Sequence, residues 1–263
     1  MTLPDLKQLE AIVKTAAEEI LLPGFGKYDY TYKSDGSIIT PADEAMQLRL
    51  AQKLTEAWPQ YAILGEEMGE AEQRKAMASP GGYWCIDPLD GTNNYATGMP
   101  FFAVSIALII DRKQELGFIL DPMRDEVFTA IKGEGAALNG ERLKAAQNKT
   151  EIKRAVAEID MKRLSNELAI RLVTEEPFSS QRNIGSSALD WCWLAASRYN
   201  VYLHGGQKLW DYAAGNLIVH EAGGQSIALD GEPVFRGRYE DRSALASLDG
   251  ALFDYWKQWV GIK

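Results

Sequence analysis

The sequence predicts a mixed fold that is α+β in its first half and α/β in its second half. Three observations predict it. Two helix patterns open the chain, at residues 6–22 and 41–57. Hairpin-type strand patterns then follow one another between residues 101 and 140. Strand and helix patterns alternate from residue 155 onward, which is typical of an α/β layer.

The two N-terminal helices are predicted from apolar spacing and from their end signals. Apolar residues recur at helical spacing over residues 6–20, and Pro23 with Gly24 is expected to end this helix near Leu22. The Thr-Pro-Ala-Asp sequence at 40–43 supplies an N-cap threonine, a proline at the first helical position and the acidic residue of a capping box. A second helix is therefore expected to start at residue 41.

Short apolar runs in the first half predict the strands of one hairpin-rich, mostly antiparallel sheet. Pro88 is expected to end one of them, because proline cannot donate to a strand ladder. The polar residues 27–40 are interpreted as a hairpin or mobile loop, and residues 68–82 as an exposed connection. The expected strands are 61–64, 83–86, 101–110, 114–120 and 126–131.

The second half begins after a polar, basic stretch at residues 144–154. We expect this stretch to join an N-terminal subdomain, residues 1–143, to a C-terminal one, residues 144–263. Strands are expected at 155–159, 183–184, 201–203 and 244–248, and helices at 166–174, 186–197, 210–221 and 252–260.

Composition excludes several classes of protein. The chain has a net charge of −9, which argues against a general nucleic-acid or anionic-membrane binder. The two cysteines, Cys85 and Cys192, lie in apolar stretches and are expected to be reduced core residues. No run of 18 apolar residues or signal-type segment occurs, so a cytoplasmic protein is expected. With so few histidines and cysteines, a zinc site is not expected.

The most informative stretch is Asp87-Pro-Leu-Asp-Gly-Thr92, at the end of an apolar strand pattern. Asp87, Asp90 and the carbonyl of Leu89 are hard oxygen ligands of the kind that Mg²⁺ prefers. Gly91 and Thr92 offer backbone N–H groups and a hydroxyl for an anion. A polar turn would explain the same residues, since Asp-Pro and Asp-Gly are common turn dipeptides.

Two further acidic positions favour the site over the turn. Glu66 lies in Gly65-Glu66-Glu67 after another apolar run, and Asp211 follows Trp210 at the start of a helix pattern. Several acidic side chains, each at the edge of a buried element, are what a multi-metal site requires.

These three motifs, in this order and spacing, resemble the inositol monophosphatase family of Mg²⁺-dependent, lithium-sensitive phosphatases. The likeness covers nearly the whole chain. It implies a layered αβαβα sandwich, two or three Mg²⁺ ions, a small phosphorylated metabolite as substrate and a homodimer. By the resemblance, Glu66, Asp87 and the Leu89 carbonyl hold the first ion, and Asp87, Asp90 and Asp211 the second.

The resemblance also assigns catalytic roles. Thr92 and Asp43 would orient and deprotonate the attacking water, with Glu66 supporting a third, weaker ion and no phospho-enzyme formed. Capping alone would account for Asp43, whose position at a helix N-terminus is expected to keep it ionised. Lys33 would cover the site, although a solvated loop lysine is the plain alternative.

Substrate contacts are implied for two groups of residues. The first group lies around the phosphate. Asp90, Asp211 and Lys33 would lie close to the substrate. The N–H groups of Gly91 and Thr92 would bind its phosphate oxygens. The other is the Gly185-Ser186-Ser187 turn together with His204. His204 stands seven residues before Asp211, where inositol-specific relatives commonly carry Glu, and could favour a more anionic substrate when protonated.

The resemblance therefore leaves the substrate open. The expected reaction is Mg²⁺-dependent hydrolysis of an inositol-1-phosphate-like monoester to alcohol and phosphate. Histidinol phosphate, fructose 1,6-bisphosphate, adenosine 3′,5′-bisphosphate and NADP are alternative substrates. Two rival interpretations are a haloacid-dehalogenase-type phosphatase, although its Asp-x-Asp spacing is absent, and a family member that mainly binds a protein or RNA assembly.

Overall fold

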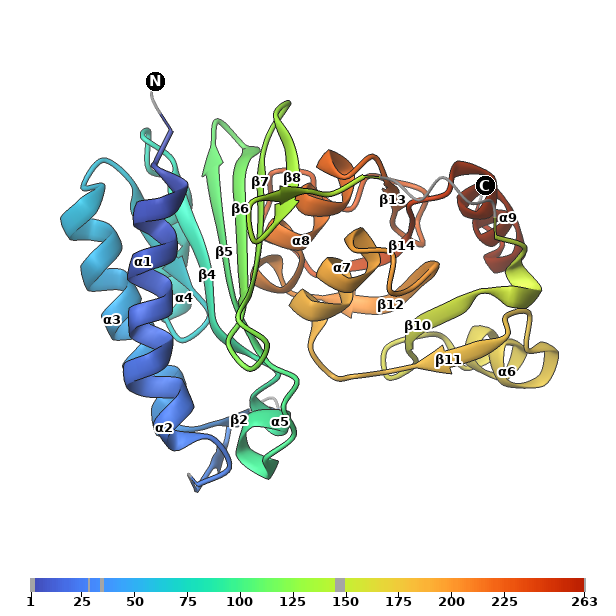
Figure 1. Cartoon of the computed structure of the whole chain (residues 1–263), viewed down its shortest axis with the longest axis horizontal. Helices are drawn as coiled ribbons and strands as arrows, with labels where there is room; N and C mark the ends of the chain where they lie inside the picture. The colour runs from blue at the N-terminus through green and yellow to red at the C-terminus, as the bar shows by residue number, and fades with distance from the viewer. Residues whose placement is uncertain (1–2, 28, 34–35, 145–149, 263) are drawn as a thin grey trace.

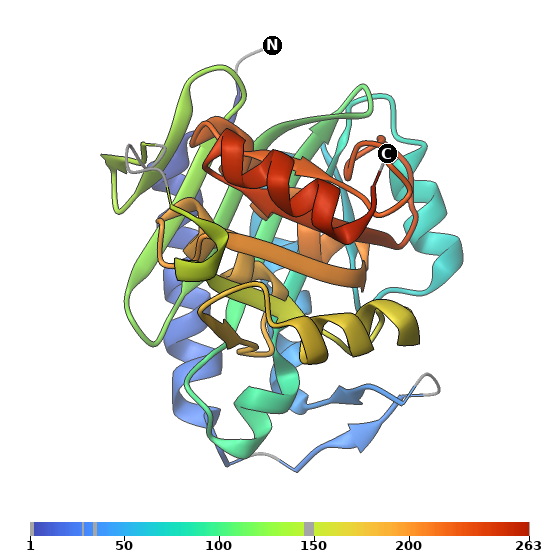
Figure 2. The same ribbon diagram turned by 90° about the vertical axis from the view of Figure 1, so that its right-hand side faces the viewer.

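Five layers, alternately helical and sheet, make up the computed structural model of the chain (Figure 1). The structure describes residues 3–27, 29–33, 36–144 and 150–262. In order, the layers are α1 with α3, a seven-stranded sheet, α7 with α8, a five-stranded sheet, and α6 with α9 (Figures 1 and 2). The expected αβαβα sandwich is confirmed.

The first layer is held by apolar side chains that point at the large sheet. Its helices are α1 (Leu6–Ala16), a π-helical segment (Ala17–Leu21), α2 (Leu22–Gly24) and α3 (Pro41–Ala57). The first helical run thus extends to Gly24 rather than ending near Leu22, because Pro23 fits the first turn of α2. Thr40 and Asp43 form the expected capping box on α3.

The polar segment between α2 and α3 contains the expected hairpin. Strands β1 (Thr31–Tyr32) and β2 (Ile38–Ile39) pair antiparallel. Residues 28 and 34–35, which belong to this predicted loop, lie outside the described residues.

The large sheet has the order β3-β4-β5-β6-β7-β8-β9, antiparallel except for the parallel pair β3-β4. Parallel neighbours need a crossover, and helix α4 (Glu70–Met77) provides it. Residues 68–82 form the expected connection, and many of them are exposed, but the helix within it was not predicted. The strands are β3 (Ala62–Gly65), β4 (Tyr83–Asp90), β5 (Ala103–Ile110), β6 (Lys113–Asp121), β7 (Glu126–Ile131), β8 (Gly135–Leu138) and β9 (Glu141–Arg142).

Strand β4 runs through Pro88 to Asp90, so the prediction that the strand ends at Pro88 was wrong. The ladder to β5 shifts register between Asp87 and Asp90, and at such an irregularity no N–H is required of the proline. The short helix α5 (Thr92–Thr97) follows directly. The extra length of β4 places both aspartates at the end of a buried strand.

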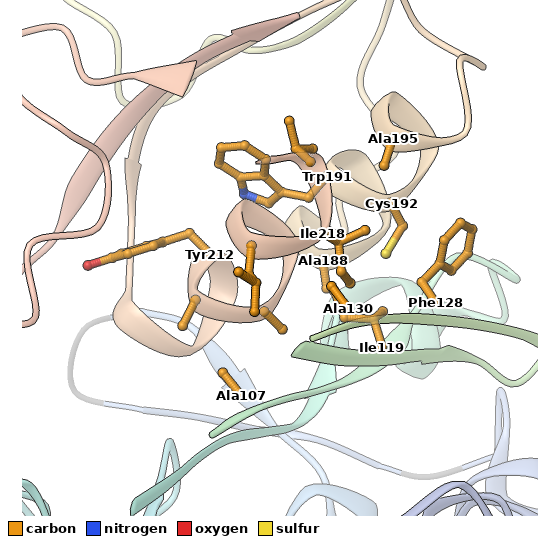
Figure 3. Close-up of a cluster of buried hydrophobic side chains, with 14 of the residues drawn as sticks. Ala107, Ile119, Phe128, Ala130, Ala188, Trp191, Cys192, Ala195, Tyr212 and Ile218 are labelled. Atoms are coloured by element: carbon orange, nitrogen blue, oxygen red, sulfur yellow. The ribbon is translucent and has the colours of Figure 1, made fainter. Parts of the chain in front are cut away.

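The middle layer consists of α7 (Ser187–Ala195) and α8 (Leu209–Glu221), which pack between the two sheets. Figure 3 shows part of this core, in which Ile218 and Cys192 from the helices lie nearest Ile119 and Phe128 of the large sheet. The Trp191 ring packs on the other side, against Tyr202 of the second sheet, with the ring centroids 5.0 Å apart. The two cysteines are buried and free, as expected.

The second sheet has the order β11-β10-β12-β14-β13, with β11, β10 and β12 parallel and β14 antiparallel to its neighbours. The strand expected at 183–184 lies earlier, at β11, and β13 was not predicted. A 3-10 turn (Ile152–Arg154) precedes the sheet, and the part of the predicted join at 145–149 lies outside the described residues. The strands are β10 (Val156–Asp160), β11 (Ser180–Arg182), β12 (Val201–Gln207), β13 (Gln225–Ile227) and β14 (Arg242–Ser247).

The outer helices α6 (Asn166–Glu175) and α9 (Gly250–Val260) cover this sheet, and Leu172 and Trp256 are buried there (Figure 1). No helix within residues 3–262 that the structure describes combines the length and apolar character needed to cross a bilayer. The division of the chain at residues 143 and 144 stays a prediction.

Candidate active site

Three aspartates from two elements converge at the end of strand β4. One carboxylate oxygen each from Asp87, Asp90 and Asp211 lies within 4.8 Å of the others. The first two stand at the end of β4, and Asp211 is the third residue of α8. Residues more than a hundred positions apart in the sequence are thus brought together because α8 packs across β4 and β5.

Each of these carboxylates is held by backbone or hydroxyl donors. The N–H of Leu89 donates to Asp87 Oδ1 at 3.0 Å, and the N–H of Lys208 donates to Asp211 Oδ2 at 2.8 Å. Asp90 Oδ2 accepts from the Ala188 N–H at 2.8 Å and from the Ser186 hydroxyl. The residues at the start of α7 therefore hold the Asp90 side chain in place. Asp211 belongs to the N-terminal cap of α8, because its carboxylate accepts from the Lys208 N–H.

Burial dominates the electrostatics of this cluster. It raises the pKa of Asp87 and Asp211 well above their usual range, and neighbouring carboxylates raise both further. Burial also raises the pKa of Asp90 to about 6, although hydrogen bonds from Ser186 and Ala188 oppose the rise. A divalent cation would reverse these shifts, because its charge favours the ionised form. Three oxygen donors at this spacing fit Mg²⁺ or a similar hard ion.

Glu66 lies beside this cluster rather than within it. Its N–H donates to the Ile86 carbonyl at 3.1 Å, which places it next to β4. Its side chain is bound by Lys33 Nζ at 2.9 Å, and the same ammonium contacts Glu67 at 2.6 Å. After burial, the charge of Glu66 is the next cause that raises the pKa of Asp87. Lys33, Glu66 and the aspartates therefore share one electrostatic environment.

Asp43 and Thr92 meet at the same place. The Thr92 hydroxyl lies 2.9 Å from Asp43 Oδ1 and 3.0 Å from the Leu89 carbonyl oxygen. The Thr40 N–H and hydroxyl both donate to the other oxygen, Asp43 Oδ2, at 2.8 and 2.6 Å. The capping function and the contact with Thr92 thus use different oxygens of one carboxylate.

The expectation that Asp43 ionises easily was wrong in direction. Burial raises its pKa, and the hydrogen bonds from Thr40 and Thr92 offset only part of that rise. The helix N-terminus does not compensate, since the side chain is only 1% exposed and water cannot solvate the charge. A raised pKa suits a proton acceptor, because the conjugate acid is then less strong.

Two glycines allow the backbone to close around the site. Gly91 has φ +88°, and a Cβ there would lie 2.9 Å from the Phe101 carbonyl oxygen. Gly185 has φ +75° and packs against the side chain of Asn94, whose Nδ2 donates to the carbonyls of Phe101 and Ile184 at 2.7 and 2.6 Å. Asn94 thereby ties the turn before α7 to the turn after β4.

A sequence model of the inositol monophosphatase family matches residues 4–257. The chain belongs to the inositol monophosphatase family. This removes the basis for the haloacid-dehalogenase-type alternative, which belongs to a different class of phosphatase.

Individual relatives carry two kinds of name. The "Nus factor SuhB" of Haemophilus influenzae is 38% identical over 199 residues, 74% of this chain and 73% of the relative. "Inositol monophosphatase 1" of Bos taurus is 32% identical over 206 residues, 76% and 74% of the two chains. A crystal structure of the extragenic suppressor protein suhB from Bartonella henselae superposes with a TM-score of 0.86 at 27% identity, covering 98% of both chains.

In this family member, His204 is not the protonated histidine that was expected to favour a more anionic substrate. It lies in β12 rather than in a loop and is 4% exposed. Its Nδ1 accepts from the Gly206 N–H at 3.1 Å, so the proton of the neutral ring is on Nε2, 3.6 Å from Asp160. Burial lowers the pKa of His204 to about 4, so the ring is neutral near pH 7.

The Gly185-Ser186-Ser187 turn lies beside the cluster, but the Ser186 side chain is buried and its hydroxyl donates to Asp90. Direct contact of this turn with substrate stays a prediction. Sequence reasoning singled out neither Asp160 nor Arg163, which lie near His204, nor Asn94 and Glu67. Glu67 had a sequence signal, its place beside Glu66.

Proposed function

We propose that this protein is a Mg²⁺-dependent phosphatase that hydrolyses a small phosphate monoester to an alcohol and inorganic phosphate. The observation that supports it is the convergence of Asp87, Asp90 and Asp211 within 4.8 Å, next to the hydrogen-bonded pair of Asp43 and Thr92. An inositol-1-phosphate-like ester is the leading substrate, and the four other phosphate esters named above are alternatives.

The ligands would be those implied by the family resemblance. Glu66, Asp87 and the Leu89 carbonyl would hold one Mg²⁺, and Asp87, Asp90 and Asp211 a second, with a third supported by Glu66. When bound, such ions neutralise phosphate oxygens, lower the pKa of water and stabilise the departing oxygen.

The chain's own residues would orient the nucleophile. The Thr92 hydroxyl faces Asp43 Oδ1, so a water that donates to Thr92 Oγ1 would pass its proton along this pair to the carboxylate. Asp43 is held in place for this by Thr40. The N–H groups of Gly91 and Thr92 would bind the phosphate oxygens. No side chain of the protein need be phosphorylated in this scheme.

A panel of phosphate esters tests the proposal. Purified protein is incubated with Mg²⁺ and inositol monophosphates, fructose 1,6-bisphosphate, histidinol phosphate, adenosine 3′,5′-bisphosphate or NADP, and phosphate release is measured. We expect release from at least one ester and its abolition by EDTA. Absence of release from every ester would contradict the proposal.

A second candidate function rests on the name "Nus factor" carried by the Haemophilus influenzae relative. In that case binding to a protein or RNA assembly would be the main role and hydrolysis secondary. Co-purification at mild ionic strength tests it: a stoichiometric protein or RNA partner supports it, and a protein that elutes alone contradicts it.

We also propose a cytoplasmic homodimer that lithium inhibits. Family resemblance supports each of these properties. Sedimentation measures the oligomeric state, and a LiCl titration of phosphate release measures inhibition.

A further inference from the structure

In the second sheet, the carboxyl ends of the parallel strands lie on the side of the acidic cluster. Strands β11, β10 and β12 are parallel, so their carboxyl ends lie at the same edge. The residues that follow them along the chain are 161–163 after β10, the turn at 183–186 after β11, and 208–211 after β12. Two of these three connections already supply contacts to the aspartate cluster. Ligands of open α/β sheets bind at this edge.

The third connection brings a fixed cation to the same edge. Arg163 Nη1 donates to the Gly206 carbonyl oxygen at 2.5 Å. The Arg163 backbone packs on Gly205, where a Cβ would lie 2.1 Å from the Arg163 carbonyl carbon. Only glycine at 205 permits this approach, so the loop after β10 is seated directly on β12, between His204 and Lys208.

Arg163 has no opposing carboxylate in the part of the chain that the structure describes. Among the described residues no Asp or Glu oxygen lies within ion-pair distance of its guanidinium, although the chain has 37 acidic and 28 basic residues. Two other cations of this region are paired with carboxylates: Lys208 with Asp241 at 2.9 Å, and Lys33 with Glu66 and Glu67. Apart from Nη1, the guanidinium donors of Arg163 have no acceptor among the described residues, so a ligand can bind them.

The field of Arg163 reaches both the aspartates and His204. Burial is the main cause that raises the pKa of Asp211, and Arg163 opposes that rise. Burial also lowers the pKa of His204, and Arg163 lowers it further. His204 is thus a neutral hydrogen-bonding group, and Arg163 is a cation whose charge acts on both His204 and Asp211.

We propose that Arg163 determines specificity by binding a second anionic group on the alcohol part of the substrate, so that the preferred substrates are phosphate monoesters with a further phosphate or carboxylate. This rests on the proposed function, since the first phosphate is taken to lie at the aspartate cluster. A guanidinium recognises such an oxyanion with charge-assisted, directional hydrogen bonds.

Matched pairs of esters test this inference. Each pair shares one alcohol: fructose 1,6-bisphosphate with fructose 1-phosphate, and adenosine 3′,5′-bisphosphate with adenosine 3′-monophosphate. For wild type we expect a higher kcat/KM on the bisphosphate of at least one pair. Arg163→Gln should lower that value by about 10-fold to 100-fold, the size of one charge-assisted hydrogen bond, and change the monophosphate value by less than about twofold.

Lys162→Gln is the matched control, because it removes the same charge from the adjacent, exposed position. It should leave both esters of a pair nearly unchanged. Equal losses in Lys162→Gln and Arg163→Gln, or equal losses on both esters, would overturn the assignment to Arg163. The proposed function would survive either result, because wild type would still release phosphate.

A binding measurement decides the question without turnover. Affinities of the same pairs are measured by calorimetry with Ca²⁺ in place of Mg²⁺, after a check that no phosphate is released. Tighter binding of the bisphosphate that Arg163→Gln abolishes supports the inference. Equal affinities of wild type for both members of each pair contradict it, even if no ester is hydrolysed.

Discussion

The hydroxyl of Thr92 lies 2.9 Å from the carboxylate of Asp43, although 49 residues separate them in the chain. Thr92 begins α5 directly after β4, and Asp43 stands in the first turn of α3. The first turns of two helices thus share one hydrogen bond near the end of β4. The contact links a structural cap to the proposed nucleophile position.

Replacing Thr92 tests this contact. Thr92→Val keeps the shape of the side chain but removes the hydroxyl, so we expect kcat to fall by about 100-fold or more, in the range of lost acid–base catalysis. Thr92→Ser retains the hydroxyl, so its kcat should stay within about tenfold of the wild-type value. Phosphate release at saturating Mg²⁺ measures both. A fully active valine variant would remove Thr92 from the mechanism.

Asp90→Asn should separate activity from folding. The amide oxygen can still accept from Ser186 and Ala188, while the amide nitrogen replaces a metal-binding oxygen. Activity should fall by at least about 100-fold, because a metal ligand is worth several kcal/mol of transition-state stabilisation. The melting temperature without Mg²⁺ should not fall, since one repelling charge is gone. Near-normal turnover of this variant would contradict the proposed ligand set.

Mg²⁺ should stabilise the fold. The carboxylates of Asp87, Asp90 and Asp211 lie close together, so they repel one another when ionised, and binding of a cation stabilises them. At a hundred times its dissociation constant, a bound ion adds about 2.7 kcal/mol, which is about 5–10 °C in melting temperature for a domain of this size. Calorimetry with Mg²⁺ and with EDTA measures the shift.

Asp87→Asn is the control for that experiment. It should melt higher than wild type in EDTA and gain less from Mg²⁺, because both the repulsion and a ligand are removed. An identical Mg²⁺ response in the variant, or no response in wild type, would show that the ion does not bind at this cluster.

Glu158 should make the stability depend on pH. It is fully buried in β10, and burial followed by the charge of Asp160 raises its pKa from 4.5 to about 8. Between these values the folded state holds a proton that the unfolded chain releases, so the free energy of unfolding falls as pH rises, by about 1.4 kcal/mol per unit. This stability is fully present below pH 4.5 and is lost as pH rises through about 8.

Glu158→Gln removes that titration while keeping the shape of the side chain. The difference between the melting temperatures of the variant and of wild type should therefore increase from pH 5 to pH 8. The measurement is made in EDTA, because metal binding at the nearby cluster would otherwise contribute. Thermal unfolding at four pH values measures it. A difference that stays constant over this range would mean that Glu158 does not titrate as described.

The helices and strands that carry strong local sequence signals were predicted correctly. The capping box at Thr40 and Asp43 and the apolar stripe of α3 were correct, as were the hairpin strands β5 to β7. The helix α4 was missed because its residues are mostly polar and charged, and its apolar face is narrow. The continuation of β4 through Pro88 was missed because a register shift, which depends on the partner strand, makes the proline acceptable.

Asp87, Asp90, Asp211 and the Thr92 pair could be named from sequence because each stands at the end of an apolar element in a recognisable motif. Arg163 and Asp160 have no such motif. The sheet order that seats the loop after β10 on Gly205 places Arg163 beside His204. The sequence by itself determined the acidic motifs and the layered family fold, since these depend on residue type and short spacing. Only the tertiary structure decided that His204 is buried and neutral and that Arg163 stands uncompensated at the sheet edge, because burial and charge environment depend on residues distant in the chain.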